Sequence, residues 1–70
     1  MAEIRAEMVA NVWKVLVSEG DRVDDGDTLV ILESMKMEIP VLAESPGTVT
    51  KLYVAEGDVV QEDELIAEIG

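Results

Sequence analysis

The sequence predicts one all-β domain, a sandwich or barrel made of two similar halves. Seventy residues are enough for a single domain, residues 1–70. The apolar residues are mainly branched aliphatics, 11 Val and 5 Ile with no Phe, and such side chains favour strands. Short apolar runs are separated by turn signals rich in Gly and Asp, which is typical of all-β folds. An internal repeat predicts the two halves.

The repeat places residues 4–32 over residues 41–69, with an offset of 37 and nine identities in 29 positions. Two copies joined by a short connection predict pseudo-twofold symmetry rather than a solenoid. The identical pairs are Ala6/Ala43, Glu7/Glu44, Val12/Val49, Lys14/Lys51, Val17/Val54, Glu19/Glu56, Gly20/Gly57, Asp21/Asp58 and Val23/Val60.

Each half opens with an apolar stretch that leads to Glu-Gly-Asp. Val12, Val15 and Val17 are spaced by three and then two, where an unbroken strand would give two and two. Residues 49–54 repeat the break at the same place. A β-bulge would let the strand bend while its apolar side chains continue to face inward. We therefore expect a bulge in both halves, with Trp13 partly exposed on a sheet face.

Residues 59–69 are ambiguous when read alone, because their intrinsic propensities also suit a short helix. The matching residues 22–32 contain Gly26 and the strand-favouring run Leu-Val-Ile-Leu. The repeat therefore predicts a turn and a strand in both segments.

The formal net charge of −11 would repel the phosphates of nucleic acid and an anionic membrane surface. It also favours solubility and a monomer. No apolar stretch reaches the length of a membrane span, and no charged-then-apolar leader opens the chain. We therefore expect a cytoplasmic protein that binds neither nucleic acid nor membrane.

The chain contains no Cys and no His, which excludes disulfides, the usual zinc sites and the common acid–base or thiol centres. Four aspartates lie between residues 21 and 27, but the spacing and downstream Glu of a calcium loop are missing. We expect these to be solvated turn residues, and Tyr53 to be partly exposed. The sequence thus predicts no catalytic residue and no metal site.

Between the two halves lies Glu-Ser-Met-Lys-Met-Glu, residues 33–38. Residues 29–33 and 37–42 have the composition of strands, so Met35 and Lys36 should form a two-residue hairpin turn. Such turns prefer Asn-Gly or other Gly-containing pairs, because their backbone takes positive φ angles. A pair that breaks a local rule in this way indicates a functional site.

Lys36 is the candidate functional residue of this hairpin. Lys14 and Lys51 are related to each other by the repeat, whereas Lys36 has no counterpart. Met35 and Met37 on either side would offer an adaptable docking surface, because thioether side chains are flexible and polarisable.

The hairpin resembles the biotin attachment signature, a small residue followed by Met-Lys-Met. The flanking runs Gly20-Asp21-x-Val23-x-x-Gly26, Pro46-Gly47-Thr48-Val49 and Gly57-Asp58 resemble the framework of biotinyl and lipoyl attachment domains. The resemblance covers nearly the whole chain and is closest to a free-standing biotin carboxyl carrier. It implies a flattened barrel of two four-stranded antiparallel sheets, with the termini at one end and the modified lysine at the other. Ala10 departs from the glycine common in the family, so we expect a slightly altered turn and the same fold.

Carried over by residue, the resemblance implies covalent biotin on Lys36. It implies that Met35 and Met37 are recognised during modification and carboxyl transfer, and that Glu33 is an acidic position the ligase could read. A biotin protein ligase would attach biotin from biotinyl-AMP. A biotin carboxylase would then load CO₂ as carboxybiotin, and a carboxyltransferase would pass it to an acceptor such as an acyl-CoA. The chain would be a carrier and not an enzyme.

Two alternatives remain open. The first is a lipoyl carrier with lipoate on Lys36, which the Met-Lys-Met run disfavours because lipoyl domains more often have Asp-Lys-Ala at the turn. The second is an unmodified β-module that acts by contact alone.

Overall fold

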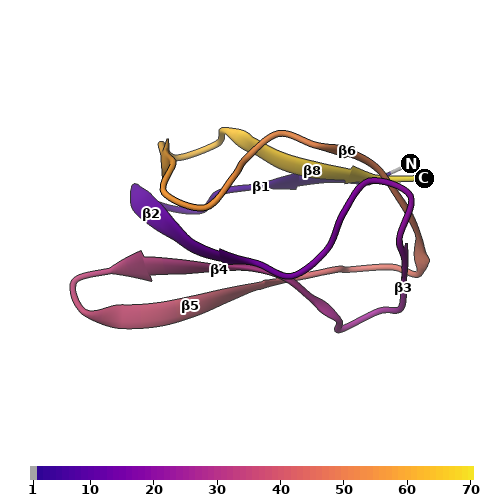
Figure 1. The fold of residues 1–70 in the computed structure, drawn as a ribbon, viewed down its shortest axis with the longest axis horizontal. Coiled ribbons are helices and arrows are strands. Elements are labelled where there is room, and N and C mark those ends of the chain that lie inside the picture. The colour runs from indigo at the N-terminus through magenta and orange to yellow at the C-terminus, as the bar shows by residue number, and fades with distance from the viewer. Residues whose placement is uncertain (1) are drawn as a thin grey trace.

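The computed structural model describes residues 2–70, which form eight strands in two antiparallel sheets packed face to face (Figure 1). The strands are β1 (Ala2–Arg5), β2 (Ala10–Val15), β3 (Arg22–Val23), β4 (Thr28–Ser34), β5 (Met37–Leu42), β6 (Gly47–Leu52), β7 (Val59–Val60) and β8 (Leu65–Ile69). One sheet has the strand order β1-β8-β6-β3 and the other β5-β4-β2-β7. The predicted all-β fold with two four-stranded sheets is confirmed.

The molecule is elongated, with extents of 31 × 17 × 17 Å. The start of β1 and the C-terminus lie at one end of the long axis, and the tip of the β4–β5 hairpin lies at the other (Figure 1). Within residues 2–70 no helix could cross a membrane.

The offset of 37 residues also relates the strands. β2 and β6, β3 and β7, and β4 and β8 each begin 37 residues apart, and β1 overlaps β5 at this offset. Exchanging the members of each pair converts one sheet order into the other. Each half contributes two strands to each sheet, so neither half contains a complete sheet of its own.

Hydrogen bonds between the halves obey the same symmetry. The N–H of Gly20 donates to the carbonyl of Val49 at 2.8 Å, and the N–H of Gly57 donates to the carbonyl of Val12 at 2.9 Å. Gly20 and Gly57 both have φ of 95°, a conformation that glycine adopts without steric cost. Each half therefore has Gly at this position because the turn there requires a positive φ angle and donates a hydrogen bond to the other half.

The predicted bulges are confirmed in both halves. The register of β2 on β4 shifts between Val12 and Lys14, which leaves Trp13 as the extra residue. The register of β6 on β8 shifts between Val49 and Lys51 at the matching place. Val12 and Val49, just before the two shifts, are buried, and Val15 and Leu52, just after them, pack against the core. Trp13 is 43% exposed, as expected for a bulged residue on a sheet face.

Residues 59–69 form β7 and β8, so the strand prediction is confirmed and the helical alternative is excluded. β8 is hydrogen-bonded to β1 on one side and to β6 on the other. Ile66, Ala67 and Ile69 are buried in the core. The strand conformation of residues 59–69 therefore depends on pairing and burial, and distant parts of the chain supply both.

The core between the sheets is entirely apolar among the described residues. Its fully buried large side chains are Leu29, Leu32, Ile66, Val12, Val30, Val49 and Val60. Ala10 begins β2 and is 5% exposed. The expected fold is therefore kept where the family glycine is replaced.

Candidate functional site

The β4–β5 hairpin presents the residues that the sequence singled out. β4 and β5 pair from Thr28 opposite Leu42 to Ser34 opposite Met37, so Met35 and Lys36 alone form the turn. Their φ angles are 52° and 64°. Two consecutive left-handed residues define the type I′ turn, whose twist matches that of the flanking strands. The predicted two-residue turn is confirmed.

This backbone is strained for residues with side chains. The left-handed conformation brings Cβ close to the following carbonyl oxygen and disfavours each such residue by about 1–2 kcal/mol. The strain is offset by the strand pairing beneath the turn, where buried Leu32 lies opposite partly buried Ile39. The hairpin therefore holds the turn in place, and the turn projects its side chains outward.

The side chains of the turn are open to solvent. Met35 is 92% exposed, Met37 is 62% exposed, and Lys36 is also exposed. Within residues 2–70 the one ion pair closer than 4.0 Å joins Arg5 and Glu3. The ammonium of Lys36 has no carboxylate partner among these residues, so its amine can reach an external reactant with the full length of the side chain.

Glu33 lies on β4 directly opposite Glu38 on β5 and Asn11 on β2. All three are exposed, so they form an outward-facing row below the turn. This row carries two negative charges close to Lys36. Its location is compatible with contact by a partner that binds the turn, but the predicted role of Glu33 in ligase recognition remains a prediction.

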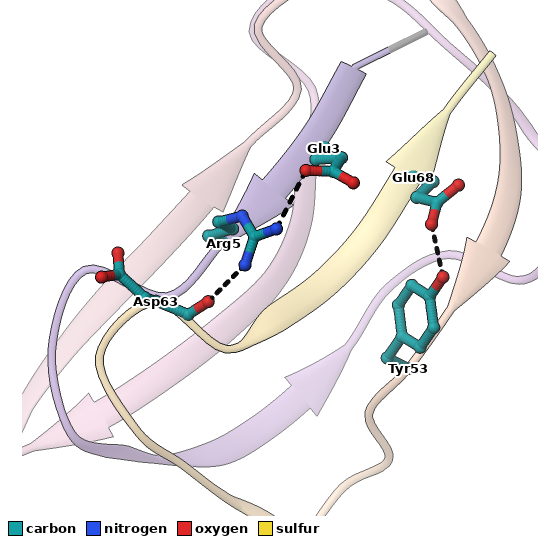
Figure 2. A network of polar contacts seen from close by, with 5 residues as sticks. All are labelled: Glu3, Arg5, Tyr53, Asp63 and Glu68. Carbon is teal, nitrogen blue, oxygen red and sulfur yellow. Dashed lines mark hydrogen bonds and ion pairs between the residues drawn. The ribbon is translucent and has the colours of Figure 1, made fainter.

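A separate polar network lies on the other sheet, around the ends of β1 and β8 (Figure 2). Arg5 donates to the carboxylate of Glu3 at 3.0 Å and to the backbone carbonyl of Asp63 at 2.7 Å. The hydroxyl of Tyr53 donates to the carboxylate of Glu68. This hydrogen bond raises the pKa of Tyr53 above its ordinary value, with smaller contributions from desolvation and the neighbouring negative charges. Tyr53 is 46% exposed, as expected.

The acidic turns have structural roles that the composition alone did not reveal. Asp21 accepts a hydrogen bond from the N–H of Ser18 at 2.8 Å, and Asp27 accepts one from the N–H of Asp24 at 2.9 Å. Such bonds close tight turns. Among residues 2–70 no group of three carboxylates could hold a metal ion.

Sequence reasoning missed two further structural residues, Glu19 and Glu56. Each carboxylate accepts a hydrogen bond from a backbone N–H in the other half of the chain, from Leu52 and Val15 respectively. The identity of Glu19 and Glu56 in the repeat was the available signal, because an exposed glutamate kept in both copies indicates a shared contact.

Comparisons with known proteins agree with this geometry. A family model described as "Biotin-requiring enzyme" matches residues 2–69. The chain belongs to the biotin/lipoyl attachment family. Domains of this family are carriers rather than catalysts, so this biotin/lipoyl attachment domain has a carrier role.

Two relatives match this attachment domain over most of both chains. A "Biotinylated protein TB7.3 homolog" of Mycobacterium leprae is 61% identical over 70 residues, covering 99% of this chain and 99% of the relative. A "Biotin/lipoyl attachment protein" of Bacillus subtilis is 42% identical over 66 residues, covering 94% of this chain and 90% of the relative.

The solved structure of the urea carboxylase from Kluyveromyces lactis contains a similar fold. It superposes with a TM-score of 0.91 and 35% identity, covering 99% of this chain and 6% of the urea carboxylase. This attachment domain thus corresponds to a small part of that much longer protein. The likeness supports the fold of this attachment domain.

Proposed function

We propose that this chain is a biotin carboxyl carrier whose Lys36 is acylated by a biotin protein ligase. The observation that carries the proposal is the type I′ turn, which exposes Lys36 between the exposed thioethers of Met35 and Met37. The names of the relatives, which describe biotinylated and attachment proteins, support biotin as the group carried.

The acylation forms an amide between Nζ of Lys36 and the carboxyl carbon of biotin. The amine of Lys36 has to lose a proton as the amide forms, so the ligase has to accept that proton and supply an activated acyl group. An acyl-adenylate meets this need, because AMP leaves as the amide forms. The amide removes the positive charge of the turn and leaves a long flexible arm.

The role of the protein is then to hold this arm. A rigid two-sheet scaffold fixes the base of the arm while the arm moves. Tethering makes the encounter with a nearby active site effectively intramolecular, at an effective concentration on the order of millimolar. When attached, biotin supplies a ring nitrogen that carries CO₂. The arm would take this CO₂ from a biotin carboxylase to a carboxyltransferase. We propose that these enzymes are cytoplasmic partners of a monomeric carrier.

Intact-mass measurement on the protein from its native host tests the proposal. We expect a biotin increment on wild-type protein and none on Lys36→Arg, which keeps the charge and removes the acyl acceptor. Lys51→Arg is the matched control, because Lys51 is an exposed lysine on a strand, and it should carry the increment of wild type.

Other outcomes would contradict the proposal. A lipoyl increment alone would replace biotin with lipoate. Full support of its pathway by Lys36→Arg would show that the chain acts as an unmodified β-module.

A further inference from the structure

The outer faces of the two sheets differ in chemistry although they are related by the repeat. The outer face of the sheet that contains the hairpin carries a group of apolar side chains, which we term the apolar outer face. It consists of Trp13, Leu16, Ile31, Pro40, Leu42 and Val59.

Strand pairing shows that these side chains share one side of the sheet. Ile31 lies between Lys14 and Pro40 in the same cross-strand row, and both of those neighbours are exposed. Residues directly opposite one another on neighbouring strands project from the same face. Val59 likewise lies opposite exposed Asn11.

The positions of Leu16, directly after β2, and of Leu42, at the end of β5, follow from alternation with their neighbours. Leu16 follows Val15, and Leu42 follows Val41; Val15 and Val41 pack against the core. Leu16 is 53% exposed and Leu42 is 43% exposed. They therefore point away from the core, on the outer side.

The repeat supplies an internal comparison for each position. The outer face of the sheet β1-β8-β6-β3 has polar or charged residues at the matching positions, and Figure 2 shows part of it. In the order given above, the counterparts are Thr50, Tyr53, Glu68, Glu3, Arg5 and Arg22. The same fold is thus compatible with a polar outer face, so folding does not require the apolar one.

The size of protein interfaces shows why a partner of the hairpin must touch a sheet face. A specific interface covers about 800 Å² on each partner, whereas the whole chain exposes 4357 Å². Such an interface takes about one fifth of this surface, far more than a two-residue turn. The strands that adjoin the turn are β4 and β5, whose outer side carries Ile31, Pro40 and Leu42 of the apolar outer face.

We propose that the apolar outer face is the surface on which the ligase docks, an inference that rests on the proposed function. The unmodified lysine has only a four-carbon stem, so the ligase must bring the turn itself into its active site. Its surface then lies against the strands below the turn. Pro40 is four residues from Lys36, roughly 13 Å along the strand, and falls within such a footprint.

The charges beside the face define the surface that fits it. Glu33 and Glu38 form an exposed acidic row between the turn and the apolar residues. The ammonium of Lys14 lies 5.5 Å from the ring centroid of Trp13, within the range of a cation–π contact. The ligase should present an apolar patch to Trp13 and basic groups to Glu33 and Glu38. Partly exposed Trp is the residue type that most often dominates such contacts.

The test measures ligation kinetics with purified ligase, biotin and ATP. Trp13→Thr introduces the residue that the other half has at this position, and Leu42→Arg does the same on β5. Each variant should raise the KM for the carrier by about tenfold or more, with kcat at saturating carrier unchanged. Tyr53→Thr is the matched control, because Tyr53 is an aromatic of similar exposure on the other face, and its KM should equal that of wild type.

The outcomes separate this inference from the proposed function. If Trp13→Thr and Leu42→Arg both unfold at the wild-type midpoint and both have the wild-type KM, the apolar outer face is not the docking surface. The carrier role would remain intact. Absence of any biotin on wild-type protein would overturn the carrier role instead. Normal ligation of the variants followed by slow carboxylation would assign the face to the carboxylase. If sedimentation shows that the wild-type protein forms a dimer and that Trp13→Thr does not, the face would be assigned to a second copy of the chain. Either of these last two results would overturn the assignment of the face to the ligase.

Discussion

The carboxylate of Glu19 accepts a hydrogen bond from the backbone N–H of Leu52 at 3.0 Å. Glu19 stands in the turn that follows β2, and Leu52 is the last residue of β6. The repeat copy of this contact joins Glu56 to the N–H of Val15 at 3.2 Å. Each half therefore closes the end of a strand that belongs to the other half.

Removing these contacts should weaken the joint between the halves. Glu19→Ala and Glu56→Ala should each lower the free energy of unfolding by about 0.5–1.5 kcal/mol, the usual net contribution of one hydrogen bond. The two effects should add in the double variant, because the contacts share no partner. Urea unfolding measures the loss of unfolding free energy in each variant. Glu19→Gln keeps an acceptor oxygen, so equal stability of Glu19→Ala and Glu19→Gln would contradict the assignment.

Replacing the strained turn should increase the stability of the fold and abolish biotin attachment. Replacing Met35-Lys36 with Asn-Gly supplies residues that accept positive φ and should stabilise the fold by about 1–2 kcal/mol. For a domain of this size each kcal/mol corresponds to a rise in Tm of about 4–8 °C. The variant should also carry no biotin. Met35→Leu leaves the strain in place and is the control; a Tm of the Asn-Gly variant at or below that of the control would refute the strain.

The two thioethers beside Lys36 should serve recognition and not folding. Both are largely exposed, so Met35→Asp combined with Met37→Ala should keep the wild-type unfolding midpoint. It should slow ligation and carboxyl transfer severalfold, measured by streptavidin capture and by carboxylation of the purified carrier. Met8→Ala removes an exposed thioether outside the hairpin and should be neutral. Unchanged rates in the double variant would remove the methionines from the site.

Gly47 is required by close packing and not by its backbone angles. A Cβ at this position would lie 2.6 Å from the carbonyl oxygen of Gly70 and 2.8 Å from Cγ2 of Ile69. Gly47→Ala should therefore destabilise the fold by about 1–3 kcal/mol, as overpacking does. Ala10→Gly, the reverse change at the repeat position, should cost less than about 1 kcal/mol. Equal effects in urea unfolding would show that the crowding at Gly47 is relieved by a small shift.

Tyr53 should ionise at a higher pH than a free tyrosine. The hydrogen bond to Glu68 favours the neutral hydroxyl, which raises the pKa of Tyr53 above 10.0. Because the folded-state pKa is the higher one, the stabilising contribution is complete below pH 10 and is lost as the pH rises through the folded-state pKa. Ultraviolet titration of this single tyrosine measures the shift. Glu68→Gln should move the midpoint back towards 10, and a midpoint in wild type no higher than in Glu68→Gln would contradict the contact.

Much of the fold could be predicted because the same pattern occurs in both halves of the repeat. The break in alternation at Val12 and Val15 predicts a bulge, and its recurrence at Val49 and Leu52 excludes chance. The repeat also identifies residues 59–69 as turn and strand where local propensity favours neither state. Local pattern fails there because Asp63, with φ of 71°, occupies the position that Gly26 fills with φ of 91° in the first copy.

The site was predictable to the level of the turn. Met35 and Lys36 are flanked by two strand-like runs, and a two-residue connection between antiparallel strands allows few geometries. The exposed row of Glu33 and Glu38 and the partners of Glu19 and Glu56 were not predictable in this way. Those contacts join strands that are far apart in sequence, and no local pattern specifies which backbone N–H a side chain will meet.

The amino-acid sequence by itself determined the short-range features of this protein: its turns, its bulges and the position of Lys36 at the one hairpin that the repeat does not copy. The tertiary structure decided which sheet each strand joins, so that the halves interlock instead of folding side by side. It also decided that one outer face is apolar and the other charged. The physical reason is that turn geometry depends on neighbouring residues, whereas strand pairing and exposure depend on partners brought together only when the whole chain is folded.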